Sequence, residues 1–375
     1  MRLALVTDTF RPEVNGVTTV LATMRRGLLD RGHDVQVIAP GYGRLTSDTE
    51  VDVHRVPSVP CPAYGAVRLS WPLGQGIGSL ITRFAPDIVH VATEGPLGAF
   101  ARDRALRFRI PLVTSFHTDF PSYAERYVGK WAVAPTQRYL RWFHGPARAT
   151  QTPSEITCAE LRRLGVARPT VWGRGVDCHL FHPSRRDEGR RRALGVEGRA
   201  LVLHVGRIAI EKDVGTLVAA FQQAHAALGD TAVFCVAGDG PAVGRVRAAL
   251  PFVVHLGFLE RERLADLYAD ADLFVFTSPT ETCGLVVLEA MASGLSVIAA
   301  DAGGVQDNVR DSITGRLLPP GKPDGFARTI VALVEEPLLR HCMGQAARAF
   351  AVARDWEREL DLLVEQYESV RAPAA

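Results

Sequence analysis

Residues 273–294 read LFVFTSPTETCGLVVLEAMASG, and this stretch decides the fold because it holds a strand, a loop and a helix start in succession. The run Leu273–Phe276 is short and wholly apolar, which is typical of a strand buried on both faces of a parallel sheet. Pro279 turns the chain, and an apolar helical pattern begins near Leu285. The segment therefore predicts one βα unit with a polar loop at the carboxyl end of its strand.

The same alternation of short apolar runs and helical patterns recurs along all 375 residues, and repeated βα units build parallel sheets. The expected strands are Leu3–Thr7, Val35–Ala39, Asp87–Val91, Leu112–Phe116, Ala149–Thr152, Leu201–His204, Ala232–Ala237, Val253–His255, Leu273–Phe276 and Ser296–Ala299. The expected helices are Val17–Arg31, Gly98–Arg107, Tyr123–Phe143, Ser154–Leu164, Gly215–Leu228, Val243–Leu250, Arg261–Tyr268, Leu285–Ala292 and Trp356–Val370.

The chain is longer than the roughly 250–300 residues at which a single core stops growing, so two cores are expected. The pattern lapses over His182–Arg192, a polar stretch that we interpret as the domain linker. The predicted fold is α/β, with two Rossmann-like parallel-sheet domains, residues 1–180 and 181–355, facing across a cleft. Residues 356–375 are expected to form a helix that packs back on the first domain, although its apolar face also suits the second.

The composition, with 47% hydrophobic residues, 22% charged residues and a net charge of +2, is typical of a globular enzyme and excludes fibres and coiled coils. The charge is unevenly distributed. Met1–Val176 holds 22 Lys and Arg against 14 Asp and Glu, so the first half is basic and the second acidic. Because no nucleic-acid recognition module accompanies the basic half, nucleic acid is not an expected partner.

No apolar run approaches the roughly 20 residues of a membrane span, and Leu3–Val6 is too short for a signal peptide core. We therefore expect a cytoplasmic protein. The six cysteines lie far apart without a C-x-x-C pair, which argues against a zinc site and a disulfide framework. Neither a metal nor a cofactor is expected.

Two carboxylates flank the helix start in the opening segment. Glu281 lies in the loop before it, and Glu289 lies one turn beyond Leu285. The backbone N–H groups that begin the helix at Gly284 and Leu285 form an anion-binding end. Carboxylates accept hydrogen bonds from hydroxyl groups, and a helix start binds phosphate. The two carboxylates and the helix start together therefore suit a ligand with a diphosphate between two polyols. The alternative is that Glu281 is a helix-start charge and that Glu289 lies on a solvated face.

A pair of cations follows the strand Leu201–His204. Arg207 and Lys212 both stand at the carboxyl edge of the predicted sheet, where open α/β sheets bind ligands. Two fixed cations neutralise a diphosphate without a metal. The alternative for Lys212 by itself is a solvated surface role.

Two other patterns are interpreted structurally. Asp270-Ala-Asp272 resembles a metal-binding D-x-D, but it precedes a strand, at the edge of the sheet away from ligands, and is expected to be a turn. Gly238–Gly244 resembles a dinucleotide fingerprint with one residue too many, and Pro241 weakens that interpretation further.

In the first half, Asn15 and Gly16 end the loop after the first strand, and His117 directly follows the strand Leu112–Phe116. Gly16 lets the backbone approach a ligand phosphate closely, although simple turn chemistry explains the loop equally well. His117 is expected to have a polar role in the cleft, although a lone histidine is more often structural.

In order and spacing, these residues resemble the retaining nucleotide-sugar glycosyltransferases of the GT-B fold, specifically glycosyltransferase family 4 or "group 1". The resemblance covers nearly the whole chain. It is carried by Pro12–Val17, Phe116–Asp119, Gly175–Asp177, Gly206-Arg207, Glu211-Lys212, Gly238–Pro241 and the pair Glu281 and Glu289 with seven residues between them.

The resemblance implies that Arg207 and Lys212 bind the donor diphosphate and that Glu289 binds the ribose. It implies that Glu281, with the backbone of Cys283–Leu285, binds the transferred hexose. It also implies retention by front-face attack without a catalytic metal.

For the first half, the resemblance implies that Gly16 approaches the phosphates and that His117 lies beside the reacting sugar. On this basis the expected catalytic residues are His117, Glu281, Arg207 and Lys212, and the expected acceptor-side residues are Asn15, Thr118 and Asp119.

Cys283 departs from the family, which usually has Phe there. Arg174 within Trp172–Asp177 looks like the branch of lipid-directed α-mannosyltransferases and sulfoquinovosyl diacylglycerol synthases. This branch implies hexose transfer from GDP-mannose to a lipid or glycan acceptor. A UDP-sugar donor of the glucose type remains an alternative. A sugar-nucleotide epimerase or hydrolase and a non-catalytic sugar-nucleotide sensor are the rival functions.

The stretch Tyr123–Arg148 interleaves basic and aromatic residues, which fits an interfacial segment attracted to anionic lipid at the inner face of a membrane. The alternative places the aromatic side chains in the core and the arginines in solvent. Pro135 is expected to divide the stretch into two shorter helices. Its basic residues are Arg126, Lys130, Arg138, Arg141 and Arg148, and its aromatic residues include Tyr127, Trp131, Tyr139, Trp142 and Phe143.

Overall fold

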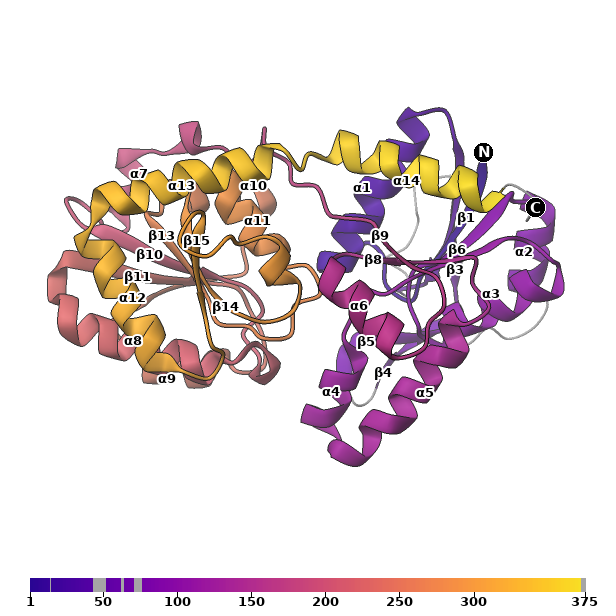
Figure 1. Cartoon of the computed structure of the whole chain (residues 1–375), viewed down its shortest axis with the longest axis horizontal. Coiled ribbons are helices and arrows are strands. Elements are labelled where there is room, and N and C mark those ends of the chain that lie inside the picture. Colours follow the sequence, from indigo (N-terminus) through magenta and orange to yellow (C-terminus); the bar gives the residue numbers. More distant parts are fainter. Residues whose placement is uncertain (14, 43–51, 62–63, 71–75, 372–375) are drawn as a thin grey trace. The chain divides into compact units, whose positions relative to one another are not determined.

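The computed structural model describes residues 1–13, 15–42, 52–61, 64–70 and 76–371. The chain forms two compact units, shown in Figure 1: Met1–Gly173 with Glu357–Ala375 is unit 1, and Arg174–Trp356 is unit 2. The chain therefore passes between the units twice, after Gly173 and after Trp356. The first passage precedes the expected boundary at residue 180.

Unit 1 contains, among its described residues, a seven-stranded parallel sheet in the order β3-β2-β1-β6-β7-β8-β9 and an antiparallel pair, β4 with β5. Its strands are β1 (Arg2–Val6), β2 (Asp34–Pro40), β3 (Val53–Val56), β4 (Ser58–Cys61), β5 (Tyr64–Ser70), β6 (Ile88–Val91), β7 (Leu112–Ser115), β8 (Ala149–Thr152) and β9 (Pro169–Val171). Its helices are α1 (Gly16–Asp30), α2 (Gly76–Phe84), α3 (Pro96–Arg107), α4 (Phe120–Tyr127), η2 (Lys130–Ala132), α5 (Val133–His144), α6 (Glu155–Arg163) and, apart from its first residue, α14 (Trp356–Arg371).

Unit 2, which is described throughout, contains a six-stranded parallel sheet in the order β12-β11-β10-β13-β14-β15. Its strands are β10 (Ala200–Val205), β11 (Ala232–Ala237), β12 (Val254–Gly257), β13 (Leu273–Phe276), β14 (Ser296–Ala300) and β15 (Gly315–Leu318). Its helices are η3 (Pro183–Arg185), α7 (Glu188–Ala193), η4 (Ile210–Lys212), α8 (Val214–Leu228), η5 (Gly229–Thr231), α9 (Val243–Ala249), α10 (Arg261–Asp270), α11 (Leu285–Ala292), η6 (Gly303–Asp307), α12 (Pro323–Glu335) and α13 (Pro337–Val352).

Most residues of the unit 2 strands are apolar because both faces of the sheet are covered. The polar exceptions include His204 in β10 and Arg316 in β15. In β10, Leu201 and Leu203 pack into the core formed with α10 and α11, whereas Val202 between them packs into the core formed with α8 and α12. All four residues of β13 are buried in the same way. The expected α/β class with two parallel-sheet units is confirmed.

Strand order reverses once in each sheet. In unit 2 the chain builds outward from β10 to β11 and β12, then returns to the other side of β10 with β13. In unit 1 the corresponding reversal lies between β1 and β6. Loops that leave two such strands diverge to opposite faces, so a crevice opens at their carboxyl ends, where doubly wound sheets bind ligands.

The helix α14 belongs to unit 1. Its Tyr367 hydroxyl is hydrogen-bonded to His90 Nδ1 on β6 at 2.6 Å, and its Leu360 packs over Gly27 of α1. A Cβ at Gly27 would lie 2.2 Å from Leu360 Cδ1, so the absence of a side chain lets the two helices approach. None of the helices in the described part of the chain is long and apolar enough to cross a membrane.

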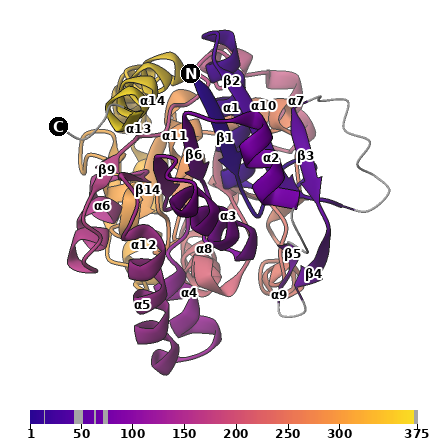
Figure 2. The ribbon, with the colours of Figure 1, turned by 90° about the vertical axis from the view of Figure 1, so that its right-hand side faces the viewer.

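The stretch Tyr123–Arg148 forms two helices, as expected, but the break is not at Pro135. The helices α4 and α5 separate at Val128-Gly129, where Gly129 has a φ of +118°, and Figures 1 and 2 show them side by side. Pro135 is the third residue of α5, where its missing N–H costs no hydrogen bond within the helix.

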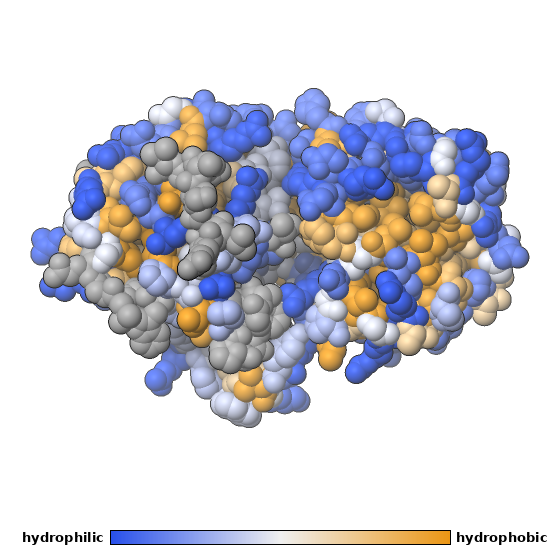
Figure 3. Space-filling view, turned by 180° about the vertical axis from the view of Figure 1, so that it is seen from behind, coloured by the Kyte–Doolittle hydropathy of each residue, from blue (hydrophilic) through white to orange (hydrophobic). Residues whose placement is uncertain are grey.

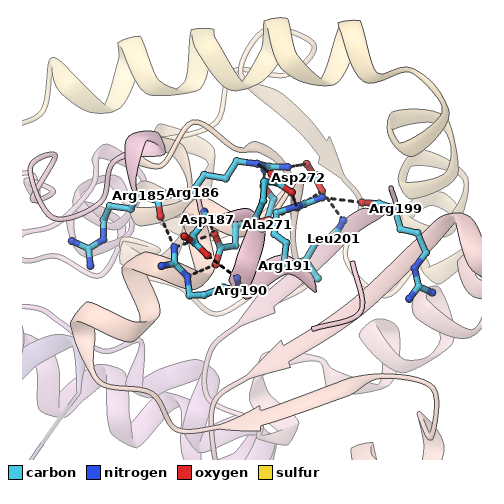
Figure 4. A network of polar contacts seen from close by, with 11 residues as sticks. Arg185, Arg186, Asp187, Arg190, Arg191, Arg199, Leu201, Ala271 and Asp272 are labelled. Atoms are coloured by element: carbon cyan, nitrogen blue, oxygen red, sulfur yellow. Dashed lines mark hydrogen bonds and ion pairs between the residues drawn. The ribbon is translucent and has the colours of Figure 1, made fainter. Parts of the chain in front are cut away.

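The polar stretch interpreted as a linker is a folded part of unit 2. Figure 4 shows Arg191 beside Asp272, the residue that precedes β13, and Arg191 Nη1 donates to Asp272 Oδ2 at 3.0 Å. Arg190 Nε donates to Asp270 Oδ2 at 2.7 Å. Asp270 Oδ1 also accepts the N–H of Asp187, the residue that caps α7. The structural interpretation of Asp270-Ala-Asp272 is therefore confirmed, and the linker interpretation is wrong.

The network predicts a stability loss for Asp270→Ala. Asp270 is 1% exposed, and its removal leaves the N–H of Asp187 and Arg190 Nε without the acceptor that they have in the wild type. We expect unit 2 to lose about 2 kcal/mol of unfolding free energy in urea denaturation. Arg316→Ala removes an exposed ion pair with Asp311 and is the matched control, with an expected change below about 0.5 kcal/mol. Equal stability of the two variants would contradict the structural role of Asp270.

Candidate active site

The reversal of strand order in unit 2 brings two loops together at the carboxyl edge of its sheet. One follows β10 and holds Arg207 and Lys212, and the other follows β13 and holds Ser278 and Glu281. Lys212 Nζ donates to Glu281 Oε1 at 2.6 Å, and the Ser278 hydroxyl donates to the same oxygen at 2.9 Å. Lys212 and Glu281, 69 residues apart in sequence, therefore meet in the fold.

This ion pair is largely shielded from water. The side chains of Lys212 and Glu281 are 14% and 18% exposed, so their attraction is screened less than that of a surface pair. The two loops are joined nearby, since the Thr280 hydroxyl donates to the Glu211 carbonyl at 3.0 Å. The pair is thus held in place and still reaches solvent.

Arg207 is the second cation at this edge. Its Nε lies 3.9 Å from Glu211 Oε1, and the Glu211 side chain is fully buried. More than a third of the Arg207 side chain remains exposed. Its guanidinium is therefore oriented by a buried carboxylate while remaining accessible to an anion.

The glycines after β11 serve loop packing. Gly238 has a φ of +134°, and a Cβ there would lie 1.9 Å from the Gly206 carbonyl oxygen. A Cβ at Gly240 would lie 2.4 Å from the Ile208 carbonyl oxygen. The loop after β11 thus supports the loop that carries Arg207, which accounts for the fingerprint-like spacing without a dinucleotide.

The start of α11 presents backbone N–H groups at the same edge. Gly284 caps the helix with φ +76° and no side-chain hydrogen bond, and a Cβ there would lie 2.9 Å from Val305 Cγ2. The first hydrogen bond between the helix and its cap runs from Val287 N–H to Gly284 O at 3.0 Å. The N–H groups of Leu285 and Val286 precede it and lie at the positive end of the helix dipole.

Glu289 lies on α11 in an apolar environment. Burial raises the pKa of its carboxyl from 4.5 to about 7, against the opposing effects of Arg261 and of the Tyr268 hydroxyl, which donates to Glu289 Oε2 at 3.4 Å. Glu289 is partly exposed, but its carboxyl contacts Tyr268 of α10, so it does not lie on an open, solvated helix face. The expectations from sequence did not include Tyr268 and Arg261, because only their position on the neighbouring α10 brings them to Glu289.

Cys283 is a buried, neutral thiol. Burial raises its pKa to about 12, against the opposing effects of Arg174 and Arg354. A thiol with this pKa is not a nucleophile near neutral pH. Its contribution is the shape of the loop between Glu281 and α11.

In unit 1, Asn15 and Gly16 form the start of α1. Asn15 Oδ1 accepts the N–H of Thr18 at 2.9 Å, and the Asn15 N–H donates to Thr18 Oγ1 at 3.0 Å, which is a complete capping box. Both Asn15 and Gly16 are exposed. The loop therefore has the simple turn chemistry named above as the alternative, in the form of the capping box. It also has an accessible helix start.

His117 follows β7 by two residues and is half-buried. The neighbouring Asp119 caps α4, since its carboxylate accepts the N–H of Ser122 at 3.2 Å. The carbonyl of Thr118 accepts the N–H of Phe120 at 2.8 Å. Thr118 and Asp119 thus build the turn that holds His117 at the carboxyl edge of the unit 1 sheet.

A buried carboxylate at the reversal of strand order in unit 1 was missed. Asp8, two residues after the end of β1, accepts the N–H groups of Leu97 and Gly98 at 2.9 and 3.1 Å and the hydroxyl of Thr93 at 2.9 Å. Burial raises its pKa to about 6 against these hydrogen bonds. The sequence shows only a Thr-Asp dipeptide at the end of a strand. The start of α3, to which Asp8 is hydrogen-bonded, is about 90 residues away in sequence.

Both halves of the chain match known protein families. Residues 14–180 match the family described as Glycosyltransferase Family 4, and residues 186–350 match Glycosyl transferases group 1. The chain is 38% identical to a GDP-mannose-dependent alpha-mannosyltransferase of Mycolicibacterium smegmatis over 99% of this chain and 98% of that protein. It is 34% identical to the sulfoquinovosyl transferase SQD2 of Arabidopsis thaliana over 92% of this chain and 68% of that protein.

Among solved structures, Anabaena HepE in complex with UDP and glucose superposes with a TM-score of 0.80 at 22% identity, covering 98% of this chain and all of that one. This likeness concerns the fold. Together with the family matches, it confirms the resemblance inferred from the sequence. The chain therefore belongs to glycosyltransferase family 4 and is a hexosyltransferase with the GT-B fold.

Proposed function

We propose that this chain transfers a hexose, with retention of anomeric configuration, from a nucleotide-sugar to a lipid or glycan acceptor, and that the donor is GDP-mannose. The observation that carries the proposal is the Lys212–Glu281 ion pair, which lies where the loops after the neighbouring strands β10 and β13 leave the sheet. Doubly wound sheets bind ligands at this point. A nucleotide-sugar has a diphosphate, which a cation binds, and a ring of hydroxyl groups, which donate hydrogen bonds to a carboxylate. The ion pair supplies both groups.

In the proposed complex, the diphosphate takes the place of Glu281 beside Lys212. Glu281 then accepts hydrogen bonds from hydroxyl groups of the hexose. The backbone of Cys283–Leu285 also contacts the hexose. Arg207 and the N–H group of Val286 add positive charge around the phosphates. Because these groups offset the charge of the leaving diphosphate, the proposal requires no metal ion.

In the proposed reaction, the bond between the anomeric carbon and the phosphate oxygen breaks, and the acceptor oxygen bonds to the same face of that carbon. The acceptor hydroxyl proton passes to the departing phosphate. Arg207 and Lys212 stabilise the negative charge that develops on the diphosphate. Unit 1 is proposed to supply the acceptor-binding residues, among them His117.

GDP-mannose is proposed as donor because the Mycolicibacterium relative, which matches nearly the whole chain, is named for that donor. Glu289 is the group proposed to bind the ribose. The buried environment of its carboxylate strengthens hydrogen bonds donated by the two ribose hydroxyls.

Substitution of the ion pair tests the proposal. Glu281→Ala and Lys212→Ala are each expected to reduce mannosyl transfer from GDP-mannose to lipid vesicles by about a hundredfold or more, because each removes a charge from the reacting site. Transfer is measured as radiolabelled product in the presence of EDTA, since no metal is required. Circular dichroism is expected to show an intact fold.

The control for both variants is Arg316→Ala, which lies in an exposed ion pair of unit 2 and is expected to retain wild-type transfer. Wild-type activity in either Glu281→Ala or Lys212→Ala would contradict the proposed site. Consumption of GDP-mannose without any acceptor would instead favour the epimerase or hydrolase.

The raised pKa of Glu289 predicts a pH-dependent affinity for nucleotide. With a pKa of about 7, the carboxyl is mostly protonated at pH 6 and accepts ribose hydrogen bonds poorly. Calorimetric titration with GDP is expected to show affinity rising about tenfold between pH 6 and pH 8. Folding stability changes in the opposite direction, because the contribution of a raised carboxyl pKa is present at low pH and lost as pH rises through about 7.

Glu289→Gln is the matched variant for this titration. It cannot ionise, so its affinity for GDP is expected to be low and independent of pH over the same range. A wild-type profile as flat as that of Glu289→Gln would show that Glu289 does not contact the ribose.

The lipid acceptor is supported by the surface of the two helices α4 and α5, with the short η2 between them. We call this surface the aromatic-basic pair. Most of its aromatic side chains are outside the core, among them Trp131, which is 73% exposed, and Tyr127, which is 52% exposed. Phe143, in contrast, is buried. Exposed basic residues lie among them: Arg126, Lys130, Arg138 and Arg141. Aromatic rings with adjacent cations suit the interface of an anionic membrane.

Exposed apolar surface alone does not identify a membrane contact. Figure 3 shows a broad apolar area over unit 2 in the view from behind, and Leu338 of α13 is 82% exposed. The aromatic-basic pair differs in its cluster of cations. We therefore propose peripheral binding to the cytoplasmic face of an anionic membrane through the aromatic-basic pair.

Liposome co-sedimentation tests this surface. Trp131→Glu is expected to weaken binding to vesicles containing phosphatidylglycerol by about tenfold or more, because it removes an inserted ring and adds a repelled charge. Leu338→Glu makes the same kind of change in unit 2 and is expected to leave binding unchanged. Equal effects of the two variants on vesicle binding would contradict the proposal. Wild-type binding that does not depend on salt or on anionic lipid would contradict it as well.

A further inference from the structure

Asn308, immediately after η6 in unit 2, is a buried side chain with two well-defined partners. It is 2% exposed, its Nδ2 donates to the Cys283 carbonyl at 2.6 Å, and its Oδ1 accepts from Arg354 Nη1 at 3.0 Å. The chemistry of the partners fixes the orientation of the amide. A carbonyl requires a donor and a guanidinium requires an acceptor, so the reversed amide would lose both hydrogen bonds.

The contact with Cys283 matters because of the peptide group to which that carbonyl belongs. The Cys283 C=O and the Gly284 N–H are part of one planar trans peptide and point in opposite directions. Holding the carbonyl therefore fixes the direction of the Gly284 N–H. Asn308 also lies against Gly284 itself, where a Cβ would be 3.8 Å from Asn308 Nδ2.

Arg354 in turn is held on several sides. Its guanidinium carbon lies 4.7 Å from the centre of the Phe350 ring, and its carbonyl accepts the N–H of Val176 at 3.0 Å. Val176 and Arg354 lie next to the two points at which the chain leaves unit 2. Gly175 packs there against the backbone of Trp356, since a Cβ at Gly175 would lie 2.6 Å from Trp356 N.

We propose that Asn308 and Arg354 are positioning residues for the sugar-binding loop Cys283–Leu285. Arg354 holds the Asn308 amide, the amide holds the Cys283 carbonyl, and the carbonyl directs the Gly284 N–H toward the hexose. This inference rests on the proposed function, in which the loop contacts the hexose while Arg207 and Lys212 contact the diphosphate. The loss of Asn308 should therefore affect binding of the sugar far more than binding of the nucleotide.

Asn308→Asp separates this role from folding. The carboxylate keeps the partner Arg354 as an ion pair, but it repels the Cys283 carbonyl instead of donating to it. Calorimetry on the full chain is expected to show GDP affinity within about twofold of wild type and GDP-mannose affinity reduced about tenfold. In transfer assays the KM for GDP-mannose is expected to rise and kcat to fall.

Arg348→Ala is the control, because Arg348 binds the Ala292 carbonyl at the opposite end of α11. It is expected to lower the Tm while leaving the ratio of GDP-mannose to GDP affinity unchanged. Arg354→Met is the second variant should Asn308→Asp fail to fold. It withdraws the support of the Asn308 amide and is expected to lower the same ratio about threefold.

Equal effects on GDP and GDP-mannose, or no effect on either, in Asn308→Asp or in Arg354→Met would overturn the positioning role. A wild-type chain that binds neither GDP, UDP nor their sugars would contradict the proposed function instead. The two failures are thus distinguishable, because the inference depends on the ratio between sugar-nucleotide and nucleotide affinities in a chain that binds the nucleotide.

Discussion

The ion pair between Lys212 and Glu281 is the interaction on which the proposed donor site depends. It exists because strand order reverses between β10 and β13. Two loops that are separated in sequence by α8, β11, α9, β12 and α10 therefore leave the sheet at adjacent strands. The glycines at 238 and 240 let a third loop support this arrangement at close range. The cation and the carboxylate are held together with little exposure. In the proposed complex, the diphosphate and the sugar each replace one partner of this pair.

Around this pair, buried polar groups position the backbone. Asn308 holds the carbonyl before α11, and Asp8 holds the start of α3 in unit 1. Such groups are costly to bury unless their hydrogen bonds are satisfied, and here each bonds to a backbone group that defines a loop. The raised pKa values of Asp8 and Glu289 reflect the same dehydration.

Much of the fold could be predicted from the sequence because strands buried on both faces are locally recognisable. Ala232–Ala237 and Leu273–Phe276 were predicted to the residue, as was the helix Leu285–Ala292. The strands β9 and β15 were missed because they are short and carry polar residues. The stretch around Arg190 was misread as a linker because its aspartate partner is 80 residues away, and local pattern carries no information about such contacts. For the same reason Lys212 and Glu281 could be named as candidates, while Asn308 and Tyr268 could not.

The central claim is that unit 2 binds a nucleoside diphosphate-sugar at the carboxyl ends of β10 and β13, and a thermal-shift titration with GDP, UDP and ADP and their sugars tests it most directly. A ligand that binds only the native state raises its Tm in proportion to the logarithm of concentration above Kd. We predict a saturable rise that is largest for GDP and GDP-mannose. No rise with any of the three nucleotides or their sugars would contradict the claim.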